Sequence, residues 1–436
     1  MRLLRSRVLP SLRKVLLLAF LLIASCTSIP SSDDQTAVSR DQPPIEDFVE
    51  SKLYVSPDAY DFSENPALLE RLLESPHTYF RFINQESTQA VCAIQRARGV
   101  AGIATVNLHG DAHLEQYLTT ATNRGLTDFD AASTGPPLID LVRFGVSVSL
   151  AAEMLGWSEQ RRELLEEFVR GYRTAVEEPD TNPPLPAVVT RIRSGIRTDH
   201  AAFLAWAEQL MSDQDQIRKR IETGGKLYQE QMRQIYPDLP DHFFAVKRGG
   251  RLRMGVGSAL DRKFLFRIEG PTASPDDDLI LEAKEIDLKR DFGCARRLGL
   301  RVGQILVAQS RIALRPDPYI GFVHFHPSRA QTREVDPEIW DGSLFWVHSW
   351  EDGYTELSVE ESFQSYEELK EVVFDVGIQL GLGHPKGVMS PHDDHLRGIL
   401  LWVIETYEDQ YYEAVDIMTN STIQAWNRFK TDVGDD

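Results

Sequence analysis

Two regions of the chain, 138–236 and 366–418, carry apolar residues at intervals of three and four positions. That spacing gathers the apolar side chains on one face of a helix. We therefore predict amphipathic helices over 138–155, 158–178, 217–235, 366–384 and 395–418.

The interval between these regions has a different pattern. After Pro240, short apolar runs bounded by Gly, Pro and Asp occupy 263–270, 278–286, 319–326 and 343–350. Such runs are typical of strands in a hairpin or meander. Another apolar run, 102–108, ends in a polar turn and is typical of a buried strand that leads into a loop.

From about Ile45 to the end of the chain, no further segment has the composition of a linker. A single small hydrophobic core seldom holds together a segment of this length. We predict an α+β protein of two lobes that share an interface. The mostly helical lobe is built from 45–240 and 351–436, and the smaller, antiparallel-sheet lobe comprises 241–350.

Residues 1–25 have the pattern of a signal peptide and are predicted to lie outside the fold. Five basic residues precede the apolar run VLLLAFLLIAS, which is short for a membrane span and ends in small residues before Cys26. The ending LIASC resembles the bacterial lipoprotein box, which implies cleavage and acylation at Cys26. The alternative is an uncleaved membrane anchor.

Lipidation of Cys26 implies a protein of the bacterial cell envelope, with the lipid bilayer as a partner. Thr27 rather than Asp follows the cysteine, which favours the periplasmic face of the outer membrane in hosts of the proteobacterial kind. Residues 26–44 are rich in Ser, Asp, Gln and Pro and are predicted to form a flexible tether.

The net charge of −19 argues against nucleic acid as a partner, because phosphate contacts require clustered Lys and Arg. Cleavage before Cys26 would make the chain still more acidic. The acidity is typical of a soluble surface. A small molecule or a nucleotide is the expected kind of ligand.

With Cys26 acylated, only Cys92 and Cys294 remain. The periplasm is oxidising, so the two thiols could form a disulfide, whereas two buried free thiols fit the sequence equally well. Neither cysteine belongs to a CxxC or Cys/His motif, and we expect no catalytic role for either.

The residues that carry chemistry follow the strand predicted at 102–108. The segments VNLHGDAHLEQYL and LTDFDAASTGPPLIDLVRF hold acids and histidines where a structural segment would have apolar residues: His109, Asp111, His113, Asp128, Asp130 and Asp140. Catalytic and binding residues concentrate on loops held by a rigid scaffold. We therefore predict the functional site here.

These motifs resemble those of aminoglycoside and choline kinases, which have the protein-kinase-like fold. Those enzymes have HGD, an Asn five residues after that Asp, then I-D-F or I-D-W, then D-L-A; this chain has HGDAHLEQ and TDFDAASTGPPLIDLVRF in the same order. The longer pattern, with ESPHTYFRF upstream, resembles the bacterial domain-of-unknown-function family 2252. The resemblance implies a kinase-like phosphotransferase that uses ATP and Mg²⁺.

Carried over residue by residue, the resemblance implies a role for each member of the site. His109 and Asp111 would belong to the catalytic loop, in which Asp111 orients the hydroxyl that accepts the phosphoryl group. Asp140 would be a buried acid that ties this loop to the following helix, and His113 would be structural.

The same resemblance makes Asp128 the magnesium-binding acid, with Asp130 and Gln116 as further ligands. Gln116 stands where the kinases have Asn. Its amide oxygen is the same chemical type but lies one methylene further from the backbone, and magnesium demands a strict octahedral geometry.

On the phosphate-donor side, LILEAKEI resembles the strand that carries the phosphate-binding lysine, which implies this role for Lys284. A turn of small residues would offer the backbone N–H groups of Gly255, Gly257 and Ser258 to an anion. Residues 301–314 would form the helix that follows the lysine strand.

The order of these parts differs from that of kinase-like enzymes, in which the strand-rich lobe precedes the catalytic loop. We therefore infer a circular permutation, in which 377–384 stands where those enzymes have the helix before the loop. Chain termini often lie close together, which makes such a permutation physically accessible. Lys284 is then expected beside Asp128, across a cleft.

The favoured function is a membrane-anchored phosphotransferase that acts on a small-molecule or protein hydroxyl. One alternative is a non-catalytic, kinase-like binding lipoprotein, because the periplasm is expected to hold little nucleotide triphosphate. The other is a metal-dependent hydrolase. In that reading His109, Asp111 and His113, as alternate residues of an extended segment, would hold a metal ion that activates water.

Overall fold

The computed structural model describes residues 44–60, 62, 66–99, 104–196, 199–212, 214–252, 262–286, 293–296, 301–326 and 342–434. Residues Ile45–Asp436 form one compact unit. The predicted signal peptide and tether, the lipidation site Cys26 and the predicted phosphate-binding turn of Gly255, Gly257 and Ser258 lie outside the described residues.

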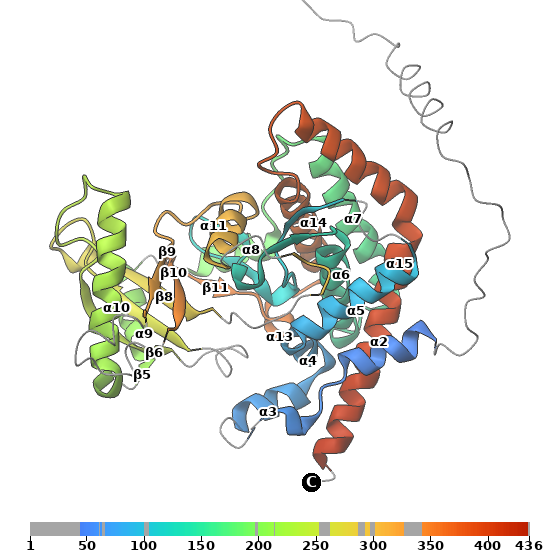
Figure 1. The fold of residues 1–436 in the computed structure, drawn as a ribbon, viewed down its shortest axis with the longest axis horizontal. Coiled ribbons are helices and arrows are strands. Elements are labelled where there is room, and N and C mark those ends of the chain that lie inside the picture. Colours follow the sequence, from blue (N-terminus) through green and yellow to red (C-terminus); the bar gives the residue numbers. More distant parts are fainter. Residues whose placement is uncertain are drawn as a thin grey trace, which may run out of the picture. The chain divides into compact units, whose positions relative to one another are not determined.

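Helices dominate the described chain (Figure 1). The α-helices are α2 (Ile45–Leu53), α3 (Pro66–Glu74), α4 (Pro76–Phe82), α5 (Asn84–Ala97), α6 (Leu138–Met154), α7 (Arg161–Glu177), α8 (Ala187–Gly195), α9 (His200–Gln209), α10 (Gln214–Ile235), α11 (Arg301–Arg311), α13 (Val359–Ser362), α14 (Tyr366–Gly383) and α15 (His392–Gly434). Two short 3-10 helices, η3 (Leu114–Gln116) and η4 (Phe129–Ala131), lie before and after the hairpin formed by residues 117–126.

The strands form three sheets, and every strand pair among the described residues is antiparallel. The largest sheet has the order β5 (Met211–Ser212), β6 (Val246–Leu252), β7 (Lys263–Ile268), β8 (Leu279–Glu285), β10 (Leu344–Trp350), β9 (Gly321–His324). Smaller sheets pair β1 (Val106–Leu108) with β4 (Ser133–Gly135), and β2 (Tyr117–Thr119) with β3 (Arg124–Leu126) and β11 (Thr355–Glu356). The predicted α+β class is confirmed.

The six-stranded sheet has one face that packs against α10, and an opposite face that carries charged residues beside a second apolar cluster, which includes Leu265, Ile280 and Trp350. Phe264, Leu281 and Phe345 belong to a hydrophobic cluster that includes Tyr228 and Met232 of α10, and Figure 1 shows α10 lying along the sheet. Side chains alternate between the two faces of a strand. The residues between these apolar positions therefore point to the opposite face, which is the one that carries the candidate lysine.

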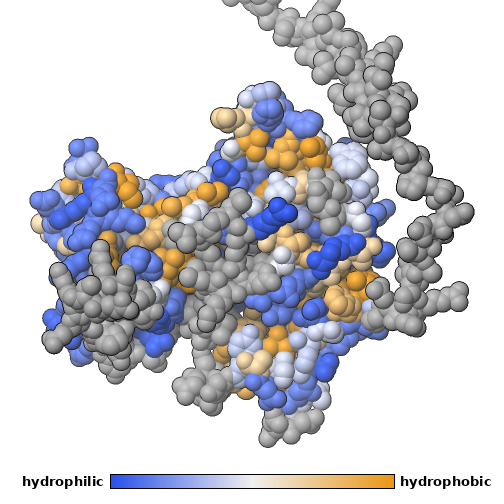
Figure 2. Space-filling model, in the orientation of Figure 1, coloured by the Kyte–Doolittle hydropathy of each residue, from blue (hydrophilic) through white to orange (hydrophobic). Residues whose placement is uncertain are grey.

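Helix α10 departs from the expected organisation. From its sequence, this helix was assigned to the helical lobe, which was expected to extend to residue 240. In the structure, α10 packs against β6 and β9 of the six-stranded sheet. The apolar stripe of an amphipathic helix can be buried against a sheet or against other helices, so the stripe alone does not identify the partner. On the face drawn in Figure 2, the surface around α10 is mostly hydrophilic, as expected for the solvent side of an amphipathic helix.

Helices α7 and α14 pack closely because glycines line their contact. A Cβ atom on Gly377 would lie 2.4 Å from the carbonyl oxygen of Phe168, and one on Gly381 would lie 2.5 Å from that of Tyr172. Backbones can approach this closely only where no side chain intervenes. Together with α6 and α15, these helices enclose the main hydrophobic core.

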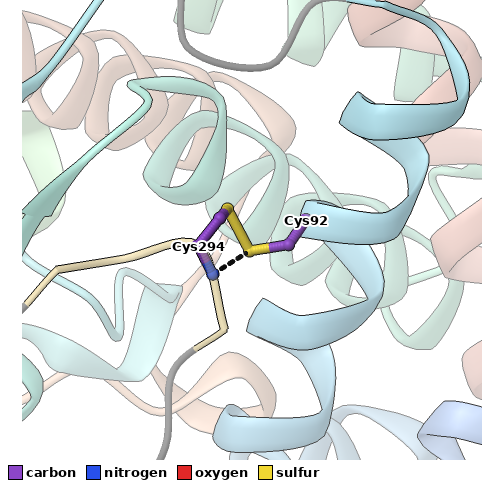
Figure 3. The surroundings of a disulfide bond; sticks show 2 residues. All are labelled: Cys92 and Cys294. Carbon is purple, nitrogen blue, oxygen red and sulfur yellow. Dashed lines mark hydrogen bonds between the residues drawn. A yellow bond between two sulfur atoms is a disulfide. The ribbon is translucent and has the colours of Figure 1, made fainter.

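Cys92 and Cys294 form a disulfide with a Cα–Cα distance of 5.6 Å (Figure 3). Cys92 lies in α5, and the backbone N–H of Cys294 also donates a hydrogen bond to its sulfur. Two residues further on, Arg296 pairs with Thr134 of β4. The disulfide settles the alternatives that the sequence left open, and it ties the segment before α11 to the helical core.

Candidate functional site

The loop that follows β1 is held by a buried acid from α6. Asp140, in the first turn of α6, accepts hydrogen bonds from the backbone N–H of His109 at 2.7 Å and from that of Gly110 at 2.8 Å. Gly110 has a φ of +83°, and a Cβ atom there would lie 2.1 Å from the carbonyl oxygen of Ala131. Glycine is therefore required, and the predicted tie from Asp140 to the loop is confirmed.

Asp140 is ionised although it is fully buried. Burial raises the pKa of a carboxyl group, but the hydrogen bond and charge of His384 outweigh this effect and lower the pKa of Asp140 below its usual value. His384 Nε2 lies 3.2 Å from Asp140 Oδ2, and its Nδ1 lies 2.8 Å from the hydroxyl of Tyr172. The acid thus joins the loop to the end of α14.

Both ring nitrogens of His109 are used within the loop. Nε2 donates to the carbonyl oxygen of Thr127 at 2.8 Å, and Nδ1 accepts from the backbone N–H of Asp111 at 3.2 Å. His109 is also fully buried. A metal ligand needs a ring nitrogen with an exposed lone pair, so these contacts argue against His109 as part of a zinc site.

His113 is buried as well. Its Nε2 lies 4.0 Å from Asp111 Oδ1, and its Nδ1 has no hydrogen-bond partner within the described chain. Burial and the neighbouring charges of Arg81 and Arg143 lower its pKa well below the usual value, so the ring is neutral. Among the described residues, no three His, Cys, Asp or Glu side chains are grouped as metal ligands.

Asp111 keeps partial access to solvent, with 15 % of its side chain exposed. Arg143 of α6 contacts Asp111 Oδ1 through Nε at 2.7 Å and Nη2 at 2.5 Å. Burial raises the pKa of Asp111, and the charge of Asp130 adds to this effect, whereas Arg143 opposes it. Both contacts from Arg143 use Oδ1, so Oδ2 is the oxygen better placed to meet a ligand.

Asp128 meets the candidate lysine directly. Lys284 Nζ in β8 donates to both carboxylate oxygens of Asp128, at 2.7 and 2.8 Å, and lies 2.6 Å from Asp130 Oδ2. Burial alone would raise the pKa of Asp128, but Lys284 and Lys263 lower it well below its usual value. The predicted proximity of Lys284 and Asp128 is confirmed, although 156 positions separate them in sequence.

Gln116 and Asp128 flank the hairpin formed by β2 and β3. The pairing of Tyr117 with Leu126 continues to Gln116, whose carbonyl oxygen accepts from the backbone N–H of Thr127 at 2.9 Å. Asp128 follows with a φ of +60° and immediately precedes η4. The hairpin therefore brings the Gln116 backbone next to the candidate metal-binding acid.

A second charged group on the same sheet face was not predicted from the sequence. Glu282 in β8 accepts a 2.9 Å hydrogen bond from Trp350 Nε1 and lies 3.3 Å from His348 Nε2 and 3.7 Å from Lys263 Nζ. Burial would raise the pKa of Glu282, but the charge of Lys263 and the hydrogen bond and charge of His348 lower this pKa to about 2. Glu282 lies two residues before Lys284 on the predicted strand. This spacing places both side chains on one face of the sheet and could have indicated the group from the sequence.

The donor set around Asp128 fits a hard divalent cation. Carboxylate oxygens are ligands that Mg²⁺ prefers, and Asp128 and Asp130 supply them side by side at Lys284. Lys284 bridges the two carboxylates, so a cation bound by Asp128 would compete with the ammonium group for the same oxygens. The residues are therefore chemically suited to a Mg²⁺ site.

These features define an α+β protein in which an HGD loop, its buried anchoring acid and a lysine–aspartate pair belong to one compact unit. The family described as "Uncharacterized protein conserved in bacteria (DUF2252)" matches residues 64–203. The matched region contains the loop, Asp128 and Asp140 and ends before Lys284. No curated protein and no solved structure matched the chain.

Proposed function

We propose that the protein is a membrane-anchored, kinase-like phosphotransferase with a circularly permuted two-lobed fold. The observation that carries this proposal is the direct contact between Lys284 of β8 and Asp128 after β3. In kinase-like enzymes a strand lysine meets the phosphates of the nucleotide, and an acid of this kind holds the Mg²⁺ bound to them.

The order of elements around Asn107 supports the permutation. Asn107 lies in β1, just before the HGD loop, and its side-chain amide donates to the carbonyl oxygens of Gly383, His384 and Lys386 at 2.9–3.0 Å. The end of α14 therefore meets the start of the loop strand although 276 positions separate Asn107 from Gly383. In a kinase-like enzyme without the permutation, the corresponding helix would lead directly into this strand.

Each residue then has a defined task. Asp128, with Asp130 or Gln116, would hold Mg²⁺, which neutralises the charge on the donor phosphates. Asp111 would orient the acceptor hydroxyl and take its proton as the hydroxyl oxygen bonds to the γ-phosphorus and the bond to the leaving diphosphate breaks. The charge of Asp130 influences Asp111, which is consistent with a single site for both halves of the reaction.

The disulfide supports an extracytoplasmic location, because disulfides persist in oxidising compartments. It agrees with the lipoprotein box at Cys26. Within the described part of the chain, no helix combines the length and apolar character needed to cross a bilayer. Anchoring is tested by detergent partitioning and N-terminal mass analysis: wild type should enter the detergent phase, Cys26→Ser should leave an uncleaved precursor or a soluble form, and wild type in the aqueous phase would contradict the proposal.

The second candidate function is a non-catalytic binding protein with the same site. Two observations favour it: Gln116 replaces the expected Asn, and Arg143 engages Asp111. Under this alternative, ligand would bind without turnover.

A thermal-shift series on the full chain tests the site. ATP or ADP with Mg²⁺ should raise the melting temperature, because a ligand at 100 times its dissociation constant adds about 2.7 kcal/mol to the free energy of unfolding. The Mg²⁺-dependent part should vanish in Asp128→Asn and persist in Asp416→Asn, a control on α15. Nucleotide binding without γ-phosphate release would favour the second candidate, and no shift in wild type would contradict both.

A further inference from the structure

The lysine of a kinase-like site needs a carboxylate that holds it toward the phosphates. In protein kinases this acid is a glutamate on the helix that follows the lysine strand. The helix in that place here is α11, with the sequence RVGQILVAQSR, which contains no Asp or Glu. Its buried polar residue, Gln304, has no hydrogen-bond partner for either amide atom within the described chain.

We infer that Asp130 of η4 is the acid that positions Lys284, in place of an acid on α11. This inference rests on the proposed function, and it assigns Asp130 to the lysine in preference to the metal. Asp130 Oδ2 lies 2.6 Å from Lys284 Nζ, and only 13 % of its side chain and 6 % of that of Lys284 are exposed. The two charges are therefore in direct contact and largely screened from water, and an ion pair in such a place is stronger than one at the surface.

The geometry explains why two acids are needed. Asp128 and Asp130 both approach Lys284 from one loop, with Asp128 in the left-handed conformation immediately before η4. A cation that draws Asp128 away would leave Lys284 paired with Asp130. The lysine therefore keeps a partner in both states of the site, and a buried ammonium without a partner is avoided.

The position of Asp130 on η4 limits how the site can be controlled. Because the positioning acid lies on η4, the placement of Lys284 does not depend on a carboxylate that moves with α11. Helix α11 packs against η4, and the disulfide ties the segment before it to α5. Switching by displacement of an acid on α11 is therefore not available to this chain.

Amine labelling of the full chain tests the inference without any nucleotide. In the Asp128→Asn background, the protein is treated with a small N-hydroxysuccinimide ester. Mass spectrometry then measures the rate at which the Lys284 amine is acylated. Adding Asp130→Asn should speed the labelling by at least about tenfold, because a hydrogen bond to a charged group is worth roughly 1.5–3 kcal/mol. Adding Asp130→Glu, which keeps a carboxylate, should leave the rate low.

Two controls complete the design. Lys263 faces Lys284 across β7 and β8 and lies near Glu282, so its labelling should stay constant and report that the sheet is folded. Gln304→Ala in the Asp128→Asn background should not release Lys284. Equal rates with and without the Asp130 carboxylate, or release by Gln304→Ala alone, would overturn the inference. Failure of the proposed function would appear separately, as wild type that binds no nucleotide with Mg²⁺.

Discussion

Oδ1 of Asp140 accepts a 2.8 Å hydrogen bond from the backbone N–H of Gly110, and Oδ2 accepts one from that of His109. A side chain on α6 thereby sets the direction of the HGD loop. We predict that Asp140→Asn lowers the free energy of unfolding by about 1–3 kcal/mol, since an amide has one acceptor oxygen and leaves one of the two buried N–H groups without its partner. Urea denaturation measures this, with Asp416→Asn, which breaks only a partly exposed ion pair with Arg161, as a control expected within about 1 kcal/mol of wild type. An unchanged midpoint in Asp140→Asn would show that the loop needs no anchor.

Burial of His77 predicts a pH dependence of stability. Its ring is fully buried, with Nε2 2.9 Å from the hydroxyl of Ser147, and burial lowers its pKa from 6.5 to about 4. The folded protein therefore binds fewer protons than the unfolded chain between these values. Stability should be fully present above pH 6.5 and fall as the pH drops toward 4, by about 3 kcal/mol from this residue.

The measurement is a set of urea midpoints across that pH range. His77→Gln should make the profile shallower, with the buried His113 still contributing a fall of the same sign, and His395→Gln, at an exposed position on α15, should leave it as in wild type. A profile for His77→Gln that matches wild type would assign the pH dependence to other groups.

Loss of the disulfide should destabilise the fold, because it closes a loop with a sequence separation of 202 residues. Replacing Cys92 and Cys294 by Ser should lower the free energy of unfolding by about 2–5 kcal/mol. A reductant should produce a similar loss in wild type and none in the double variant. If reduction leaves the wild-type midpoint in place, the bond contributes no stability.

The close contact of α7 and α14 predicts a steric effect at Gly377. In Gly377→Ala, the new Cβ would lie 2.4 Å from the carbonyl oxygen of Phe168, so the helices must separate, at a cost of about 1–3 kcal/mol. Gly398→Ala is the matched control, because it lies in α15, where a new Cβ would have no neighbouring atom within 4 Å. That variant should be neutral or stabilised by about 0.4–1 kcal/mol. Equal melting temperatures for the two variants would contradict the packing argument.

Patterns within single segments predicted much of the fold. The apolar spacing of α6, α7 and α14, and the runs that became β7, β8 and β10, needed no knowledge of distant contacts. The tie from Asp140 and the meeting of Lys284 with Asp128 came from the resemblance to kinase-like enzymes.

Features that depend on distant parts of the chain were not predictable in the same way. Strand β6 was missed because Gly249 and Gly250 weaken a strand pattern, yet a Cβ atom on Gly249 would lie 2.7 Å from Ile221 of α10. The group around Glu282 was missed because charged residues on a strand usually face solvent. The pairing of Cys92 with Cys294 depends on a Cα–Cα distance that no local pattern contains.

Under the proposed function, Asp128 and Lys284 form a site for a nucleotide with Mg²⁺. Calorimetric titration of the full chain with a non-hydrolysable ATP analogue, with and without Mg²⁺, tests it most directly. We predict Mg²⁺-dependent binding in wild type and in Asp111→Asn, and loss of the Mg²⁺ dependence in Asp128→Asn. Binding that is indifferent to Mg²⁺ and to Asp128, or no binding by wild type, would contradict the account.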